Sequence, residues 1–353
     1  MPRSAYVDTL RALAIARVYI HHTLWIGWFT MVFPSMSVMF ALAGFLTAVS
    51  LDRGGLTRTL WSRVRRLLPP LWGLAVVAVP LMLIVGWDSV SWSDLVYWVV
   101  PLANPTTSDW AGAFGLALWY LRAYLWFVLL SPILWWLFRR WPIQSLMAPM
   151  VAAVIVHSSW MKVPPSRALD VVSSTALFGT AWMLGFARHT GLLDRLSWRV
   201  CGVIAAALGA AAGAWALFVT PDVVTEMFIG TAFVLILMRL HPSMQWLTRF
   251  RRLKTAIAAL NARAVTIYVW HLPVLFASGT LIALSGLDPL NDTLGKTLAI
   301  ALGTLFLLIA VMGTGWIEDL AAKRRPMLFP VPLAAATPAP ATAAPATAAV
   351  RAR

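Results

Sequence analysis

The chain contains ten stretches of predominantly apolar residues, each close to the length that a helix needs to cross a lipid bilayer. Of the 353 residues, 60% are hydrophobic and 12% are charged, whereas a soluble domain has roughly 45–50% apolar and about 25% charged residues. A spanning helix takes about 20 residues, and these runs are continuous rather than alternating as in a β-barrel. The sequence therefore predicts an all-α integral membrane protein, a bundle of about ten transmembrane helices at residues 8–28, 33–51, 69–87, 116–138, 145–161, 171–188, 198–218, 222–240, 256–281 and 296–317.

The high apolar and low charged content excludes a soluble globular enzyme and a disordered chain. A disulfide-stabilised scaffold is excluded because Cys201 is the one cysteine. Residues 1–28 do not form a signal peptide, because charged side chains interrupt their apolar run. The segment 91–101 is apolar but too short to span, and we expect it to be interfacial or re-entrant. Residues 326–353 are rich in Ala, Pro and Thr and are predicted to form a disordered cytoplasmic tail, so that 1–325 form the membrane domain.

The formal net charge of +15, from 28 Lys and Arg against 13 Asp and Glu, follows the expected topology. Every second connection is rich in cations, and the others carry few, with Lys162 and Arg167 as the exceptions. By the positive-inside rule both termini are cytoplasmic. The charge left over suits membrane lipids or an anionic cytosolic substrate, and no nucleic acid partner is predicted. The cation-rich connections are 52–68, 139–141, 188–199, 239–254 and 322–325.

The first predicted span carries an unusual number of ionisable side chains, each of which is costly in a membrane and therefore a functional candidate. Arg11 and His22 are eleven residues apart, which places them within about 20° of one helix face and about 16 Å apart along the axis. Asp8 lies one turn before Arg11 and is expected to hold its guanidinium. His21 points about 100° away, and we expect it to have a packing or interfacial role.

Three further spans carry polar groups that the direction of the chain places at a depth similar to that of His22. They are Arg122, Glu226 and His271. Taken singly, each of these side chains is explained equally well by snorkelling to the membrane surface or by a structural pair. A functional site is favoured because a second layer of charged side chains is predicted together with this one. The second layer lies at the cytoplasmic side and consists of Arg11, Arg63, Arg65 and Arg66.

This arrangement suits a phosphate-rich cytosolic donor and a proton transfer deeper in the membrane. Guanidinium groups bind phosphate in a bidentate manner. A histidine has a pKa near working pH and can take a proton from a hydroxyl or carry the transferred group itself. No metal site is predicted, because the sequence has no HExxH or CxxC pattern.

Five short segments, taken in chain order, carry a resemblance to a known family. Arg11 is followed by ten residues and His22; then come VMFALAGFL at 38–46, RVRRLLP at 63–69, LWYL at 118–121 with LSP at 130–132, and IYVWHLP at 267–273. This order resembles the motifs of the acyltransferase-3 family of integral-membrane O-acyltransferases. Ala43 stands where that family usually has Ser, so a hydroxyl role is unavailable at this position.

The resemblance implies transfer of an acyl group, most often acetyl, from cytosolic acyl-CoA to a hydroxyl acceptor. The implied acceptor is a glycan, a lipid-linked sugar or another small molecule. The expected location is the plasma membrane, and the large excess of Arg over Lys is typical of a bacterial coding sequence of high GC content. Arg11 and His22 become the signature pair, with His22 as general base or transient acyl acceptor. Arg63 and Arg66 become ligands of the CoA phosphates, and Arg65 joins them on charge alone.

Other candidates rest on the residues themselves. Arg122 and Glu226 are proposed as catalytic without a family motif. A substrate-binding or structural role is expected for His271, Asp8, Trp119 and Tyr120. An alternative from another class is a multi-pass transporter or flippase for an anionic or lipid-linked substrate, since buried arginines would line its cavity equally well.

Overall fold

The structure, a computed structural model, describes residues 4–24, 27–87, 90–158, 164–220, 222–289 and 291–328. Within these ranges the chain is helical and contains no β-strand, which confirms the all-α prediction. The first part of the chain forms α1 (Ala5–Leu24), α2 (Phe29–Val32), α3 (Ser35–Gly54), α4 (Leu56–Val85), α5 (Trp92–Val99), η1 (Asp109–Ala111), α6 (Gly112–Leu116) and α7 (Leu118–Arg140). The second part forms α8 (Pro142–His157), α9 (Arg167–His189), η2 (Leu193–Arg195), α10 (Trp198–Phe218), α11 (Val223–Arg239), η3 (Gln245–Arg249), α12 (Arg251–Ala262), α13 (Ala264–Leu284) and α14 (Thr293–Ala321).

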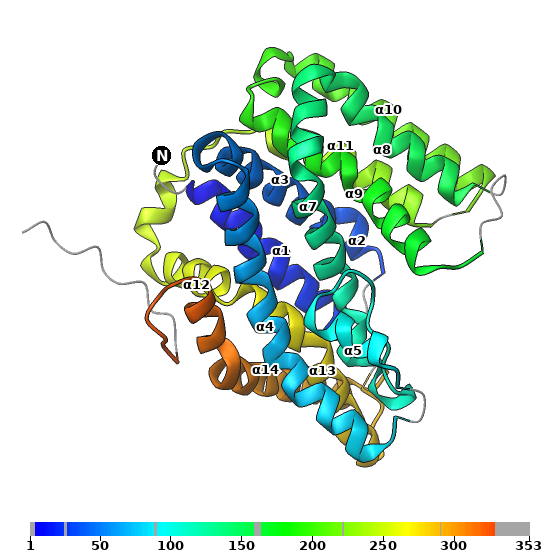
Figure 1. Ribbon diagram of the computed structural model, residues 1–353, viewed down its shortest axis with the longest axis vertical. Helices are drawn as coiled ribbons and strands as arrows, with labels where there is room; N and C mark the ends of the chain where they lie inside the picture. Colours follow the sequence, from blue (N-terminus) through cyan, green and yellow to red (C-terminus); the bar gives the residue numbers. More distant parts are fainter. Residues whose placement is uncertain are drawn as a thin grey trace, which may run out of the picture.

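The long helices run back and forth and form a bundle with two distinct ends (Figure 1). At one end lie the start of α1, the connection between α3 and α4, and α12; we call this the Arg-rich end. At the opposite end lie α5 and the starts of α7, α9 and α11. Three of the long helices begin at capping side chains that accept a backbone N–H: Ser166 before α9, Ser197 before α10 and Asp222 before α11.

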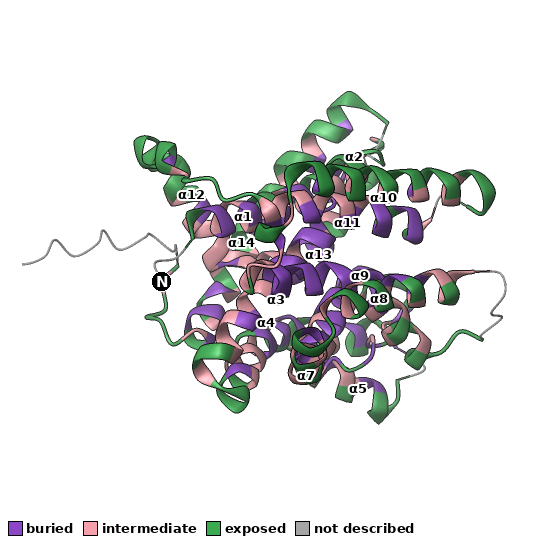
Figure 2. Ribbon diagram, turned by 90° about the horizontal axis from the view of Figure 1, so that it is seen from above, coloured by how far each residue is buried: buried purple, intermediate pink, exposed green. Residues whose placement is uncertain are grey.

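Seven segments among the described residues are long and apolar enough to cross a membrane: α2 with α3, α4, α7, α9, α10, α13 and α14. Nine of the ten predicted spans each lie mainly on one helix, and α10 matches its predicted range at both ends. Helices α8 and α11 have 16 and 17 residues, less than the usual span, and α1 carries three charged side chains. Many side chains of α10 and α14 are exposed apolar residues, as expected of helices that face lipid (Figure 2). The protein is therefore a helical membrane protein, while ten spans and the side of the termini stay predictions.

The predicted single span 256–281 is wrong, because the chain breaks into α12 and α13 at Arg263. Arg263 has φ −116° and ψ 19°, outside the helical region, and its side chain is buried. Its guanidinium donates to the Asp319 carboxylate of α14 at 2.6 Å. A Cβ on Gly315 would overlap the Arg263 side chain, so glycine provides the space for it. Burial of this charge against α14 therefore decides where α13 begins.

The predicted span 69–87 also begins too late. Helix α4 starts at Leu56 and includes the arginine segment 63–66 as well as Pro69, Pro70 and Pro80. Those arginines lie on the same helix as the apolar run. The helix therefore continues beyond its apolar part into a charged part at the Arg-rich end. The basic segment is consequently helical and held in a defined position, rather than in a loop.

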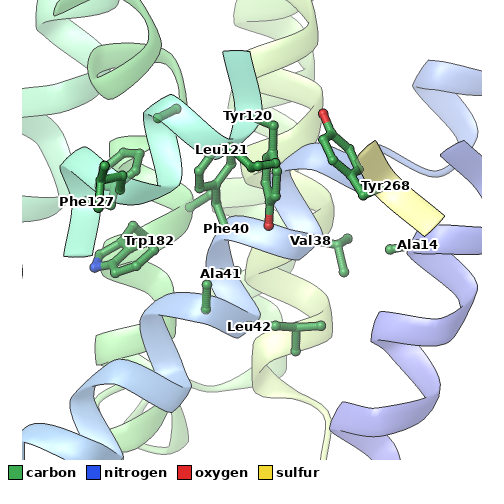
Figure 3. Packing of buried hydrophobic residues seen from close by; sticks show 14 of the residues in the cluster. Ala14, Val38, Phe40, Ala41, Leu42, Tyr120, Leu121, Phe127, Trp182 and Tyr268 are labelled. Carbon is green, nitrogen blue, oxygen red and sulfur yellow. The ribbon is translucent and has the colours of Figure 1, made fainter. Parts of the chain in front are cut away.

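The centre of the bundle is the contact between α3 and α9, where two backbones approach closely. A Cβ on Gly44 would overlap the Trp182 carbonyl, and a Cβ on Gly185 would overlap the backbone of Ala41 and Phe45. Small residues at such contacts let membrane helices pack without voids. The aromatic side chains of Phe40, Phe127 and Trp182 fill the space around this contact in Figure 3. The motif segment 38–46 therefore serves as the packing surface for α9.

We expect Gly185→Leu to prevent the close approach of α3 and α9. Overpacking a well-packed core costs about 1–3 kcal/mol and occasionally more, and here the obstacle is backbone that cannot move aside. The matched control is Gly209→Leu in α10, where a Cβ meets nothing within 4 Å. Thermal unfolding in detergent should show a large decrease in melting temperature for Gly185→Leu and little change for the control. Equal melting temperatures would contradict the role of this contact.

At the opposite end, the segment predicted to be interfacial forms α5 and is tied to α9. Ser91 and Asp94 form a capping box at the start of α5. The Asp94 carboxylate accepts from Arg167 at 2.8 Å, and the Arg167 guanidinium lies 4.8 Å from the centre of the Tyr97 ring. This pair accounts for Arg167 as an exception to the charge pattern; Lys162, the other exception, lies outside the described residues.

The Asp94 contacts predict a pH dependence of stability. Hydrogen bonds from Ser91, with a further contribution from Arg167, hold the pKa of Asp94 below its ordinary value. A lowered folded-state pKa stabilises the fold above the unfolded pKa of about 4, and this contribution is lost as pH falls through the lowered value. Asp94→Asn should therefore lower the melting temperature at pH 7, by an amount that shrinks toward pH 3. The exposed carboxylate of Asp109, as Asp109→Asn, is the control, and a pH-independent difference would contradict the prediction.

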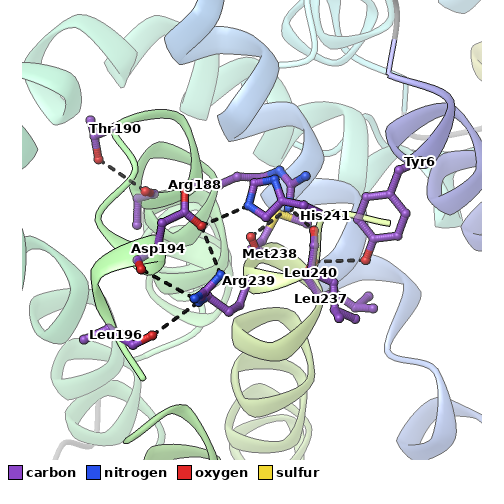
Figure 4. Close-up of polar contacts among 11 residues, drawn as sticks. Tyr6, Arg188, Thr190, Asp194, Leu196, Leu237, Met238, Arg239, Leu240 and His241 are labelled. Carbon is purple, nitrogen blue, oxygen red and sulfur yellow. Dashed lines mark hydrogen bonds and ion pairs between the residues drawn. The ribbon is translucent and has the colours of Figure 1, made fainter. Parts of the chain in front are cut away.

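At the Arg-rich end, arginines close the carbonyl ends of helices (Figure 4). Arg188 of α9 donates to the Leu240 carbonyl at 2.7 Å, just past the end of α11. Arg239 pairs with Asp194 at 3.2 Å, and the Tyr6 hydroxyl of α1 donates to a carbonyl of α11. These bonds satisfy groups that a helix end leaves open. They hold α1, α9 and α11 together at this end.

The predicted tail 326–353 lies mostly outside the described residues, which end at 328. Its described beginning is held in place. The Met327 N–H donates to the Asp319 carboxylate at 3.2 Å, and the Met327 carbonyl accepts from Arg263 at 2.5 Å. The chain is therefore anchored to α13 and α14 as far as Met327.

Candidate active site

The basic group at the Arg-rich end combines α1 with α4. Arg11, half-buried on α1, lies within electrostatic range of Arg63 on α4. Arg63 donates to the Tyr124 hydroxyl of α7 and to the Ser50 hydroxyl of α3, each at 3.4 Å. Helices α3 and α7 thus position the guanidinium that α4 supplies, and its neutral partners leave the positive charge uncompensated. The structure brings Arg11 and Arg63 together as the sequence predicted.

The remaining arginines of the motif at 63–69 extend this group. Arg66 is exposed and lies within electrostatic range of Arg63, Arg65 and Arg324. Arg324 comes from the segment after α14 and was not among the predicted ligands. The charge pattern marked it only as a topology signal. Like charges at this spacing repel one another, so the group favours binding of an anion with several negative charges.

The predicted pairing of Asp8 with Arg11 is wrong. No ion pair within 4 Å joins these two described side chains, and the Asp8 carboxylate acts on Arg11 only from a longer distance. Asp8 lies in the first turn of α1, where a carboxylate is favoured by the helix dipole. Its carbonyl accepts from the Asn261 amide of α12 at 2.7 Å. Asp8 therefore takes part in positioning α1 against α12.

Deeper in the bundle, the histidines of two motifs meet. Helix α1 is continuous, and His22 lies near its end. The ring centres of His22 and His271 are 5.2 Å apart, with α13 supplying His271. His271 Nδ1 lies 2.6 Å from the Tyr268 carbonyl, and because a carbonyl only accepts, Nδ1 carries the proton. Nε2 of His271 then holds the lone pair, and it has no hydrogen-bond partner among the described residues.

A row of aromatic rings connects the histidine pair with the basic group. From His271 the row continues to Tyr268 at 5.4 Å and to Tyr120 at 4.9 Å between ring centres. Tyr120 contacts Tyr124 at 6.3 Å, and Tyr124 accepts the hydrogen bond from Arg63. Figure 3 shows Tyr120 and Tyr268 side by side in the buried core. Tyr120, a predicted candidate, thus lies between the two ends of the site.

A cavity of about 330 Å³ opens near the histidines at the opposite end of the bundle. Residues of α1, α2, α3, α7, α9 and α11 supply its walls. Arg122 and Glu226, both predicted site residues, line it together with Trp119. Trp119 stacks against Phe178, with ring centres 5.6 Å apart. The four side chains predicted to lie at one depth are therefore in two places. His22 and His271 form the histidine pair, whereas Arg122 and Glu226 line the cavity.

Sequence reasoning assigned no role to Arg17, one of the ionisable side chains of the first predicted span. Arg17 is buried, lines the cavity and lies within electrostatic range of both His22 and Glu226. The signal was the cost of any charge within a span. Asp170 was missed as well: it pairs with Arg122 at 3.6 Å. Both residues connect parts of the site that are far apart in sequence.

The described residues contain no group of three or more His, Cys, Asp and Glu side chains that could hold a metal ion.

Comparison with known families agrees with the motifs. The family model Acyl_transf_3, described as an acyltransferase domain, matches residues 4–314. This range includes the histidine pair, the cavity and the basic group except for Arg324. Neither the curated proteins nor the solved structures show a significant match to the chain. A match over most of the chain, together with the membrane-type helices, shows that the chain belongs to the acyltransferase-3 family and is a membrane acyltransferase.

Proposed function

We propose that this protein transfers an acyl group, in the first instance acetyl, from cytosolic acyl-CoA to a hydroxyl acceptor in a bacterial plasma membrane. The observation that carries the proposal is the connection of the basic group to the histidine pair. Arg11 and His22 share one continuous helix, and the row of rings joins their surroundings. A donor with phosphates at one end and a reactive thioester at the other matches this separation.

The Arg-rich end supplies the donor site. Arg63 and Arg66, with Arg65 beside them, present guanidinium groups that form bidentate hydrogen bonds with phosphate. Arg11 lies next to them on the way to the histidines. The proposal places this end in the cytosol, where acyl-CoA is found, and leaves the outermost arginines to bind anionic lipid headgroups.

His22 is the proposed catalytic group. In direct transfer, His22 takes the proton of the acceptor hydroxyl as its oxygen attacks the thioester carbonyl. The carbon–sulfur bond breaks, and the imidazolium returns the proton to the CoA thiolate. In the two-step alternative, His22 attacks the carbonyl and releases CoA, and the hydroxyl then attacks the acyl-imidazole. His271, whose ring centre lies 5.2 Å from that of His22, is proposed to help position the His22 ring.

The acceptor is proposed to be a glycan, a lipid-linked sugar or another small hydroxyl compound. The cavity with Arg122, Glu226 and Trp119 supports this proposal, since it lies toward the end opposite the donor site and its Arg17 is within electrostatic range of His22. Polar groups beside a ring suit a carbohydrate. Family membership favours this function over a transporter or flippase.

The test is binding of acetyl-CoA and release of free CoA by the purified protein in nanodiscs. Acetyl-CoA is expected to raise the melting temperature, because a ligand that binds only the folded state stabilises it. Arg63→Ala should weaken this effect, while Arg139→Ala should not, since Arg139 is an exposed arginine that lies over the Trp135 ring. Failure of any acyl-CoA to bind would contradict the acyltransferase and favour the transporter.

A further inference from the structure

Arg17 is buried in the wall of the cavity without an ion-pair partner. The residue is 8% exposed, and its Nε and Nη2 atoms have no hydrogen-bond partner among the described residues. No carboxylate oxygen of the described chain lies within 4 Å of it. The Phe29 ring lies 5.3 Å from the guanidinium carbon and covers one of its faces. Because a buried charge in a membrane helix requires compensation, Arg17 is prepared for a ligand.

Arg122 presents the same chemistry from α7. The residue is 4% exposed, and its Nε atom lacks a hydrogen-bond partner among the residues described. Nη2 donates to the Asp170 carbonyl and to the Ser174 hydroxyl, whereas Nη1 meets the Asp170 carboxylate only at 3.6 Å. The cavity thus has two buried guanidinium groups with open donors.

The two carboxylates of the cavity lie in a different environment. Glu226 is exposed, and the Asp170 side chain is 55% exposed. Both carboxylates are therefore accessible from outside the protein, and neither accepts a hydrogen bond from the buried donors of Arg17. A ligand that combines an oxyanion with hydroxyl groups satisfies both sets of residues. Its oxyanion accepts from the arginines, and its hydroxyls donate to the carboxylates.

We propose that this cavity binds the oxyanion of the acyl acceptor, a carboxylate or phosphate carried by a sugar-sized polyhydroxyl compound, with Arg17 as the anchor. The volume of about 330 Å³ is at the small end of ligand pockets. The half-buried ring of Trp119, stacked on Phe178, provides a flat apolar wall for the carbon skeleton. His22 is not one of the described residues that line the cavity, and Arg17, which lies within electrostatic range of His22, connects the cavity with the proposed base.

That this ligand is the acyl acceptor rests on the proposed function, while binding of the oxyanion does not. The test therefore measures binding and needs no turnover. Melting temperature is recorded for the full-length protein in detergent with rising concentrations of glucuronate, glucose 1-phosphate or neutral glucose. The variants are Arg17→Gln, which keeps hydrogen-bonding capacity without charge, and Arg139→Gln as the matched control at the Arg-rich end.

The wild type is expected to be stabilised by glucuronate or by glucose 1-phosphate and not by glucose. The one that binds more tightly identifies the oxyanion as carboxylate or phosphate. Arg17→Gln should weaken this affinity by about tenfold or more, since charge-assisted bonds to the oxyanion are lost, and Arg139→Gln should leave it unchanged. Equal stabilisation by glucose, no response to either anion, or wild-type affinity in Arg17→Gln would overturn the proposal.

Acetyl-CoA is the internal check that separates this proposal from the proposed function. Its stabilising effect is expected to persist in Arg17→Gln, because the donor site lies at the other end of the bundle. Should Arg17→Gln fail to fold, Arg17→Lys and Arg122→Gln replace it, and either must weaken the anion response. A protein that binds the anionic sugar but no acyl-CoA would retain this cavity assignment and lose the acyltransferase mechanism.

Discussion

His22→Ala should reduce CoA release from acetyl-CoA by about 10²–10⁴-fold, the range that a general acid–base group contributes. The same variant should still insert and bind acetyl-CoA, because the basic group lies at the far end of α1. The measurement is the rate of CoA release at saturating acetyl-CoA in nanodiscs. Loss of rate with unchanged acetyl-CoA binding assigns His22 to the chemical step.

The neighbouring His21 is the matched control for this prediction. Its ring lies 5.1 Å from that of His22, so His21→Ala makes a similar change in volume at nearly the same depth. We expect it to retain most of the activity. If the two variants lost activity equally, the effect would come from packing of α1 rather than from a catalytic imidazole.

Asp319→Ala should lower the free energy of unfolding by about 3–5 kcal/mol, the cost of leaving one partner of a buried ion pair without the other. Arg263 and Asp319 have side chains that are 2% and 1% exposed and lie 2.6 Å apart. Asp319 also accepts from Arg324 and from the Met327 N–H. Its removal would therefore strand a buried guanidinium and release the segment after α14.

Asp194→Ala serves as the control, because Asp194 pairs with Arg239 at 3.2 Å while 46% exposed. Exposed pairs contribute about 0–1 kcal/mol, so unfolding in denaturant should be nearly unchanged. A double variant, Asp319→Leu with Arg263→Met, should recover much of the stability lost in Asp319→Ala, since it leaves no unpaired charge. Similar decreases in the free energy of unfolding for Asp194→Ala and Asp319→Ala would show that the buried ion pair contributes no more to stability than the exposed one.

Helix positions were predictable wherever an apolar run ended at a polar boundary. Helix α10 coincides with its predicted range because the run is apolar from Val200 onward and Ser197 caps its start. The same rule failed where a charged side chain found a buried partner. Arg263 lies within an apolar run, but its bond to Asp319 interrupts the helix. The interruption depends on α14, which is more than fifty residues away in sequence.

The candidate site was predictable as a set of residue types and only in part as an arrangement. Periodicity placed Arg11 and His22 on one helix, and the basic motif marked Arg63. The predicted ion pair of Asp8 with Arg11 is not formed. Asp8 lies instead in the first turn of α1, where its carboxylate is favoured by the helix dipole. Arg17 was visible as a charge but had no role without the cavity.

By itself the sequence determined the membrane class, the helical architecture and the family, because these follow from apolar run length and from short local motifs. The tertiary structure decided which polar groups meet: His22 with His271, Arg263 with Asp319, and the residues around Arg17. These contacts join segments that are far apart in the chain. They depend on how helices pack through close contacts such as that of Gly185, and periodicity along one helix carries no information about its neighbour.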